Sequence, residues 1–199
     1  MLFRSRSADS EAAGPLHLAY RATDGSQVRY AKCSAGDGVT WTKTDIATGA
    51  SGAFGDPAFS IDEGTGAYIA VVENTGSGYR IDLYISNDGG ATWQPRITAG
   101  TTFTTAPSEL ALSVRTILGL RVISIGYSTN TFATSSETRV RWTADDGANW
   151  QDQLLSSAAD SHWPDLLVKR STPDLFAAWC ADESGTTKVK ARHGVFGYF

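Results

Sequence analysis

The sequence has little of several features that would point to particular protein classes. It contains one methionine and two cysteines, Cys33 and Cys180, in 199 residues. Two cysteines this far apart form neither a metal-ligand pair nor a disulfide-dense framework. No apolar run approaches the roughly 20 residues that a membrane-spanning helix needs, and residues 1–14 have no hydrophobic stretch of the signal-peptide type. We therefore expect neither membrane insertion nor a fold stapled by disulfides.

Basic residues are also too few and too scattered for a protein that binds nucleic acid. There are 17 Lys and Arg against 21 Asp and Glu, which gives a net charge of −4. Phosphate binding needs concentrated cations that displace counterions. The histidines His17, His162 and His193 lack the spacing of zinc ligands, and no Gly-x-Ser-x-Gly or phosphate-binding loop is present. We expect no nucleic-acid partner, no metal and no cofactor.

Glycine and strand-forming residues are, by contrast, abundant. The chain has 20 glycines and 41% hydrophobic residues. Val, Ile, Thr, Tyr and Trp occur in short runs bounded by turn residues, and no segment shows sustained helical periodicity. A chain of this length can bury a sizeable core. The composition predicts one all-β domain over residues 1–199.

An eight-residue phrase occurs twice, and a worn copy occurs a third time. It reads SNDGGATW over Ser86–Trp93, TADDGANW over Thr143–Trp150 and SAGDGVTW over Ser34–Trp41, where Gly36 replaces the aspartate. An aspartate in such a turn accepts backbone N–H groups, a glycine takes a positive φ, and a tryptophan packs between sheets. We expect the phrase to be a structural fastener. Its structural residues are Ser86, Asp88, Gly90, Trp93, Thr143, Asp145, Gly147, Trp150 and Trp41.

The phrase over Ser86–Trp93 resembles the Asp-box, or bacterial neuraminidase repeat, of sialidases and many other β-propellers. The second good copy departs from it only at Asn149. The resemblance implies a β-propeller of the sialidase-like superfamily, and it suggests a secreted or surface-associated protein. It does not choose a function, because the box recurs in enzymes and in binding proteins.

Alignment on the phrase divides the chain into four units, at about 1–52, 53–103, 104–158 and 159–199. Each unit should hold three strands, with a fourth after the tryptophan. In the second unit these strands are expected at 57–62, 67–73, 80–86 and 94–98. The fourth unit ends before its fourth strand. Leu2–Ser7 is either the first strand of the first unit or this missing strand.

We expect the four units to close into a four-bladed ring, because closure removes exposed sheet edges. A piece of a larger propeller and a ring completed by oligomerisation are the alternatives. Closure would make the first and last blades neighbours. That arrangement leaves a disulfide between Cys33 and Cys180 open, beside the simpler interpretation of two buried thiols.

Ligands of propellers of this kind normally bind around the axis, on the face opposite the box turns. The strand starts that converge there supply carboxylates, which accept hydroxyl protons, and an aromatic ring, which can stack on a sugar. Equally, an acid at a strand start can simply bind local amides. The cluster is a candidate ligand site whose chemistry suits a sugar or a cation, and the structural role of each residue is the alternative. The candidate residues are Arg4, Asp56, Glu109, His162, Trp163 and Asp165.

The resemblance to sialidases also implies an arginine triad, a tyrosine nucleophile and acidic partners. Only Arg4 matches, and Arg80, Arg121, Arg139 and Arg141 are expected to be solvent-facing strand residues. We therefore expect a binding module for carbohydrate or a glycoconjugate rather than an enzyme. A sialidase-like hydrolase and a protein-interaction scaffold are the alternatives.

Overall fold

The structure is a computed structural model that describes residues 14–62, 66–95, 97–100, 102–117, 119–132, 135–156, 161–168, 174–183 and 186–195. This part of the chain holds fourteen strands and no helix. The strands are β1 (Leu16–Arg21), β2 (Gln27–Cys33), β3 (Thr42–Thr48), β4 (Ala58–Ile61), β5 (Ala67–Asn74), β6 (Tyr79–Ser86), β7 (Ile97–Thr98), β8 (Pro107–Ile117), β9 (Leu120–Phe132), β10 (Ser135–Thr143), β11 (Gln151–Ser156), β12 (Ser161–Val168), β13 (Asp174–Glu183) and β14 (Thr186–Val195).

The strands form four antiparallel sheets, each a simple up-and-down run along the chain. Sheet 1 is β1–β3, sheet 2 is β4–β7, sheet 3 is β8–β11 and sheet 4 is β12–β14. Sheets 2 and 3 have four strands and the two end sheets have three. The expected strands of the second unit fall on β4, β5, β6 and β7, so the repeat identified in the sequence corresponds to a sheet.

The repeated phrase occupies the same place in sheets 1, 2 and 3. It joins β2 to β3, β6 to β7 and β10 to β11, and in each case it connects the last two strands of the sheet. We call β2, β6, β10 and β14 the pre-turn strands, and β3, β7 and β11 the outer strands. The phrase therefore fastens an outer strand to each of the first three sheets.

Three apolar clusters hold the sheets together, one at each contact between neighbours. Tyr30 and Val28 of sheet 1 pack with Ile69 and Val71 of sheet 2. A second cluster joins sheet 2 to sheet 3 through Tyr127 and its neighbours. The third joins sheet 3 to sheet 4. The core is thus divided into layers between sheets, as in a propeller.

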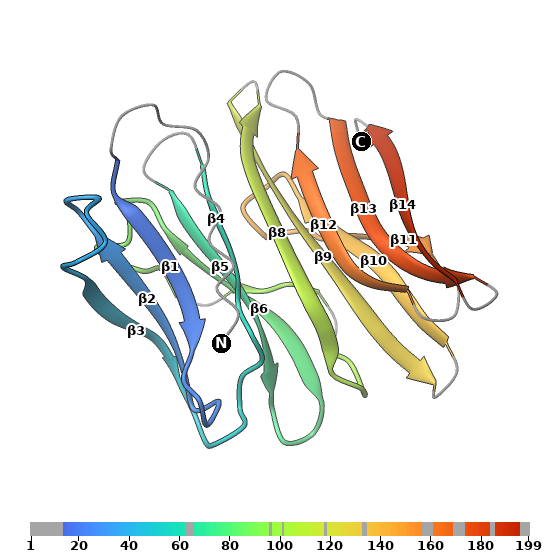
Figure 1. Ribbon diagram of the computed structural model, residues 1–199, viewed down its shortest axis with the longest axis horizontal. Coiled ribbons are helices and arrows are strands. Elements are labelled where there is room, and N and C mark those ends of the chain that lie inside the picture. The colour runs from blue at the N-terminus through green and yellow to red at the C-terminus, as the bar shows by residue number, and fades with distance from the viewer. Residues whose placement is uncertain are drawn as a thin grey trace.

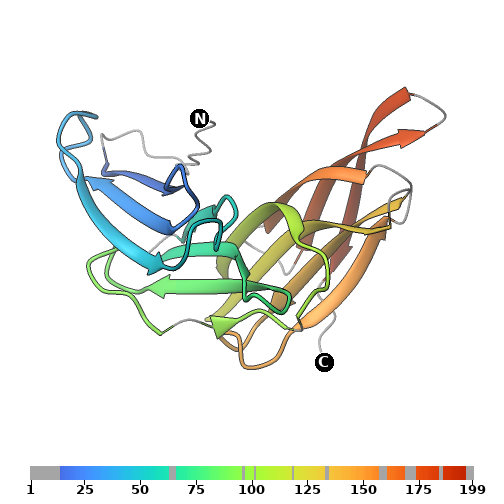
Figure 2. The same cartoon turned by 90° about the horizontal axis from the view of Figure 1, so that it is seen from below.

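The favoured closed ring is not seen in the described residues. The sheets lie in a row, with sheet 1 at one end and sheet 4 at the other (Figure 1). From below, the row bends, and the two end sheets rise on opposite sides (Figure 2). Leu2–Ser7, whose place in the fold the sequence left open, lies outside the described residues.

The two cysteines are free thiols, so the disulfide left open by the sequence is not formed. Cys33 belongs to sheet 1 and is buried, whereas Cys180 belongs to sheet 4 and is half-buried. The interpretation of two buried thiols holds for Cys33 and only in part for Cys180.

Candidate functional site

The first strands of sheets 2, 3 and 4, which are β4, β8 and β12, lie next to one another. β8 contacts both β4 and β12, and β8 and β12 run in the same direction (Figure 1). Both are interrupted near their starts by a β-bulge, between Ser108 and Ala111 in β8 and between His162 and Asp165 in β12. Bulges redirect side chains and are common beside functional sites.

The predicted acids Glu109 and Asp165 lie at these bulges. Glu109 has a φ of 58°, a left-handed conformation that is uncommon for a residue other than glycine, and it is half-buried. Asp165 is exposed, and its carboxylate accepts a hydrogen bond from the backbone N–H of Leu166 at 2.9 Å. The sequence places both acids at strand starts, but β12 begins at Ser161, so Asp165 lies inside its strand.

Asp56 has a different setting from the other two acids. It precedes β4 rather than belonging to a strand. Its side chain is 86% exposed and accepts a hydrogen bond from Arg21 Nε of β1 at 2.8 Å. Asp56 therefore contributes to the contact between sheets 1 and 2. The three acids, which the sequence predicts at equivalent strand starts, thus differ in local geometry: Asp56 precedes its strand, whereas Glu109 and Asp165 lie within theirs.

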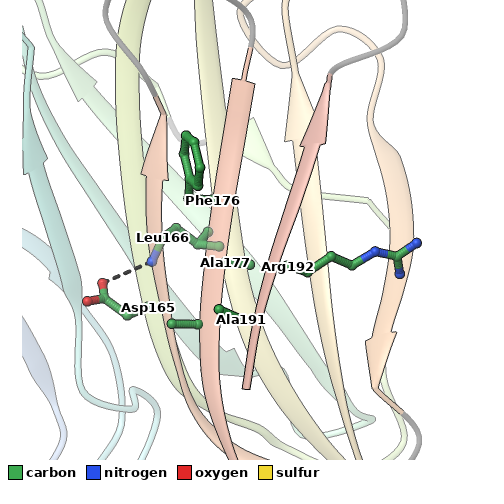
Figure 3. A pocket seen from close by; sticks show the side chains of 7 residues that line it. Asp165, Leu166, Phe176, Ala177, Ala191 and Arg192 are labelled. Atoms are coloured by element: carbon green, nitrogen blue, oxygen red, sulfur yellow. Dashed lines mark hydrogen bonds between the residues drawn. The ribbon is translucent and has the colours of Figure 1, made fainter. Parts of the chain in front are cut away.

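Asp165 lines a pocket of about 350 Å³ on sheet 4. Asp165 lies opposite Ala178 on β13, which in turn lies opposite Ala191 on β14, so these three residues share one face of the sheet. Phe176 is 42% exposed beside them. Figure 3 shows Arg192 directed away from Asp165. The lining residues are Asp165, Leu166, Phe176, Ala177, Ala178, Ala191 and Arg192.

Most of this pocket was missed by the sequence interpretation, which named only Asp165. The other lining residues come from β13 and β14, whose small apolar side chains carry no signal on their own. Pairing the three strands of the fourth unit in register would have placed Ala178 and Ala191 beside Asp165. Of the remaining predicted residues, Arg4 lies outside the described part of the chain. His162 and Trp163 lie on β12, and their side chains are not described.

The two good copies of the phrase form the same hydrogen-bonded turn. In the first, Asp88 accepts hydrogen bonds from the Ser86 hydroxyl at 2.7 Å and from the Thr92 N–H at 2.8 Å, while the Gly90 N–H donates to Ser86 Oγ at 2.8 Å. Hydrogen bonds from Thr92 are the main reason that the pKa of Asp88 falls to about 2. The carboxylate is thus used within its own turn.

The second copy repeats each of these bonds. The Gly147 N–H donates to Thr143 Oγ1 at 3.1 Å, and Asn149 donates to Asp145 from its backbone N–H at 2.9 Å and from its side chain at 2.7 Å. Asn149 therefore replaces Thr92 without loss of the bond to the aspartate. The hydroxyl of Thr143 leads the interactions that lower the pKa of Asp145 to about 2.

In the worn copy, the aspartate that accepts the turn hydrogen bonds lies one residue after the position that the alignment indicates. Asp37, rather than the residue at position 36, accepts the turn hydrogen bonds, from the Val39 N–H at 2.9 Å and from the Cys33 thiol at 3.1 Å. The Trp41 indole N–H donates to the carbonyl of Gly38 at 2.9 Å. The turn keeps an aspartate, but in a shifted position.

The expectation of solvent-facing arginines is wrong, most clearly for Arg141. This side chain is 7% exposed and donates to Asp152 at 2.6 Å and to the Ala99 carbonyl at 2.6 Å. Its guanidinium lies over the rings of Phe103, at 4.6 Å, and Tyr127, at 5.3 Å. Arg141 is a buried tie between sheets 2 and 3.

The other three arginines are half-buried and ion-paired. Arg80 pairs with Glu73 and Asp82, Arg121 with Asp146, and Arg139 with Glu137 and Asp152. These arginines are engaged with the protein's own carboxylates rather than gathered around a substrate carboxylate.

Two features are absent from the described residues. That part of the chain holds no group of three or more His, Cys, Asp or Glu side chains arranged to bind a metal ion. It also contains no helix with the length and apolar character needed to cross a membrane.

The sequence matches no family model, and no curated protein matches it. Among solved structures, the chain is similar to an α-L-arabinanase of Penicillium chrysogenum, determined in complex with arabinobiose. The TM-score is 0.57 at 16% sequence identity, and the match covers 88% of this chain and 55% of the arabinanase chain. The arabinanase is a five-bladed β-propeller. At this identity the likeness concerns the fold alone, and it agrees with the β-propeller arrangement of the four sheets.

Proposed function

We propose that this protein is a β-propeller module that recognises carbohydrate, and that the pocket beside Asp165 is its binding site. The observation that carries the proposal is the pairing of an exposed carboxylate, Asp165, with an exposed aromatic ring, Phe176, at one pocket. A carboxylate accepts hydroxyl protons, and an aromatic face packs against the apolar face of a sugar ring. The pocket volume of about 350 Å³ is within the range of small-molecule sites.

The similarity to a carbohydrate-active propeller supports this proposal. The arabinanase was solved with a disaccharide bound, so arabinobiose is a rational first ligand. The chain spans about half of the arabinanase, and its activity is not carried over. We also infer that the turns at Ser86–Trp93 and Thr143–Trp150 are Asp boxes, which supports a sialidase-like propeller and makes sialylated glycans the second ligand class.

The test is a titration of the purified protein with arabinobiose and a panel of neutral and sialylated glycans. We expect saturable binding that Asp165→Asn and Phe176→Ala each weaken at least about tenfold, because each removes one of the two groups that would hold the sugar. Asp45→Asn and Leu154→Ala, at exposed positions on outer strands, are the matched controls. Binding that is absent, or equally affected by the controls, contradicts the proposal.

The same incubations distinguish binding from hydrolysis. A glycoside hydrolase releases reducing ends from arabinan or free sialic acid from sialylated glycans, whereas a binding module leaves its ligand intact. We expect no release. Turnover that is lost in Asp165→Asn would instead favour the hydrolase alternative. A protein that binds no glycan but binds a protein partner would favour the scaffold alternative.

A further inference from the structure

His17 lies at the contact between sheets 1 and 2, with its imidazole beside two aromatic rings. It is half-buried on β1, and its ring stacks on Phe59 of β4, with centroids 6.4 Å apart and 25° between the ring planes. The Tyr30 ring of β2 lies 5.9 Å away, centroid to centroid. The ordinary pKa of histidine is 6.5, so its charge can change near neutral pH. The protonation of His17 therefore bears on how the two sheets are held together.

Hydrogen bonds connect His17 to the turn at Ser86–Trp93. His17 Nδ1 lies 2.5 Å from the Tyr30 hydroxyl. Tyr30 Oη donates to the carbonyl of Gly89 at 3.0 Å, and Lys32 Nζ donates to the same carbonyl at 3.1 Å. Gly89 belongs to the turn that joins β6 to β7 of sheet 2. Sheet 1 thus holds this turn through two hydrogen bonds, and the donor of one of them contacts His17.

Protonation of His17 would bring two positive charges together. In the antiparallel pairing of β1 with β2, His17 lies directly opposite Lys32. Like charges in this arrangement destabilise a strand pair. Burial of the imidazole, followed by the charge of Lys32, lowers the pKa of His17 below 6.5. The folded contact therefore favours the neutral ring.

The other titratable groups around this contact keep their charge near neutral pH. Asp88 accepts the hydrogen bonds of its own turn, and Asp56 pairs with Arg21 farther along β1. β4, which also packs against β1, carries no titratable side chain. Burial, and then the charge of Asp88, raise the pKa of Tyr30 to about 12, so its hydroxyl stays protonated. Among the described residues at this contact, His17 is the group that titrates between about pH 5 and pH 8.

We propose that protonation of His17 releases sheet 1 from the turn at Ser86–Trp93, which makes the contact between sheets 1 and 2 sensitive to acid. Sheet 1 lies at one end of the row (Figure 1), and it shares an apolar cluster with sheet 2. It can therefore open locally while sheets 2 to 4 stay packed. The inference rests on the fold and is independent of the carbohydrate proposal, whose pocket lies on sheet 4.

The direction of the effect follows from the lowered pKa of His17. A group that is harder to protonate in the folded contact than in the open one stabilises the contact fully above its ordinary pKa, here 6.5. It loses this effect as pH falls to the folded pKa. Opening of sheet 1 should therefore increase from about pH 7 downward and level off below the folded pKa. The response of Asp88 lies at lower pH, toward pH 2, so the two effects are separable.

Two measurements on the unaltered protein test this proposal. Heteronuclear NMR of the assigned imidazole resonances gives the pKa of His17. Hydrogen–deuterium exchange from pH 7.5 to pH 5, corrected for the intrinsic exchange rate, gives opening constants for β1 and β2, with β9 as the reference. We expect opening of β1 and β2 to increase by up to tenfold for each unit by which the measured pKa lies below 6.5. Opening of β9 should stay unchanged.

Side-chain variants separate the charge of His17 from its packing. His17→Gln keeps a polar amide but has no charge to gain, so its sheet 1 should show no acid-dependent opening. Lys32→Gln keeps a donor for the Gly89 carbonyl and removes the facing charge, so the pKa of His17 should move toward 6.5 and the response should shrink. The matched controls are His162→Gln on β12 and Lys43→Gln, an exposed side chain on β3, and both should respond as the natural protein does.

Four results would overturn the inference. The first two are a His17 pKa at or above 6.5 and an opening of β1 and β2 that does not depend on pH in this range. The third is an equal acid response in His17→Gln. The fourth is an opening of β9 that increases together with that of β1, because the protein would then unfold as a whole rather than at sheet 1.

Discussion

At the scale of single residues, the repeated turns keep their aspartates for internal use. Asp88 and Asp145 each accept hydrogen bonds from a hydroxyl two residues earlier and from a backbone N–H four residues later. Both carboxyl groups have a pKa of about 2, below the ordinary 3.8, because these donors favour the charged form. The most recognisable acids of the sequence are therefore structural groups.

The lowered pKa values predict how stability depends on pH. A carboxyl group whose pKa is lower in the folded than in the unfolded protein stabilises the folded state above the unfolded value and loses this effect as pH falls to the folded value. The contribution of Asp88 should therefore be complete above about pH 4 and disappear toward pH 2. Thermal melts from pH 2 to pH 6 should show Asp88→Asn less stable than the natural protein above pH 4, with the difference shrinking below it. A constant difference would contradict this assignment.

Gly90 is the residue at which the turn can least accept a side chain. Its φ is +88°, and a Cβ there would collide with the ring of Tyr30 on sheet 1. Gly76 has a similar φ of +83° but open space around it. We expect Gly76→Ala to cost about 1 kcal/mol of backbone strain and Gly90→Ala to cost at least about 2 kcal/mol more through the collision. Urea unfolding of both variants measures the difference. Equal losses of unfolding free energy would show that the Tyr30 ring moves aside without destabilising the protein.

At the scale of elements, the box tryptophans fasten their turns to neighbouring sheets. Trp93 meets Tyr30 edge to face, with ring centroids 5.2 Å apart, and it packs against the cluster between sheets 1 and 2. Trp150 packs in the same way against the cluster between sheets 2 and 3. Each good copy of the phrase therefore holds its own sheet against the one before it.

Removal of Trp93 should be costly in proportion to this packing. We expect Trp93→Ala to destabilise the protein by about 3 kcal/mol, the lower end for a large aromatic because the ring is only half-buried. Trp41 of the worn turn is the comparison, since it bonds within its own turn, and Trp41→Ala should cost less. Chemical denaturation followed by circular dichroism gives both values, and glycan binding by the folded Trp93 variant should persist.

The elements were predictable from the sequence because the repeat is local. Turn residues at fixed offsets located β5 and β6 to within one residue at each end. Contacts between sheets were not predictable in the same way. The burial of Arg141 depends on Phe103 of the preceding sheet, and the pocket beside Asp165 depends on the register of β13 and β14. Contacts of these two kinds produce no hydrophobic periodicity within the strand that carries the residue, so they could not be predicted from that strand alone.

At the scale of the whole molecule, the order of the sheets separates the two thiols. Cys33 and Cys180 lie in the sheets at opposite ends of the row (Figure 1). We expect mild oxidation to yield no intramolecular disulfide. A thiol reagent should label the half-buried Cys180 in the folded protein, and the fully buried Cys33 only after unfolding. Mass spectrometry of the labelled and oxidised protein tests both points, and a crosslink between the two cysteines would show that the row can close.

The two central sheets of the row should be more stable than the two end sheets. Among the described residues, sheets 2 and 3 contact a neighbour on each side, whereas sheets 1 and 4 contact one. In a stack of repeats each layer is stabilised chiefly by its neighbours. Backbone amides should therefore exchange with deuterium fastest in sheets 1 and 4 and slowest in β5, β6 and β9. A ligand bound at the pocket beside Asp165, which lies on sheet 4, would slow exchange there first, so the ends of the row are where binding would change the dynamics of this protein most.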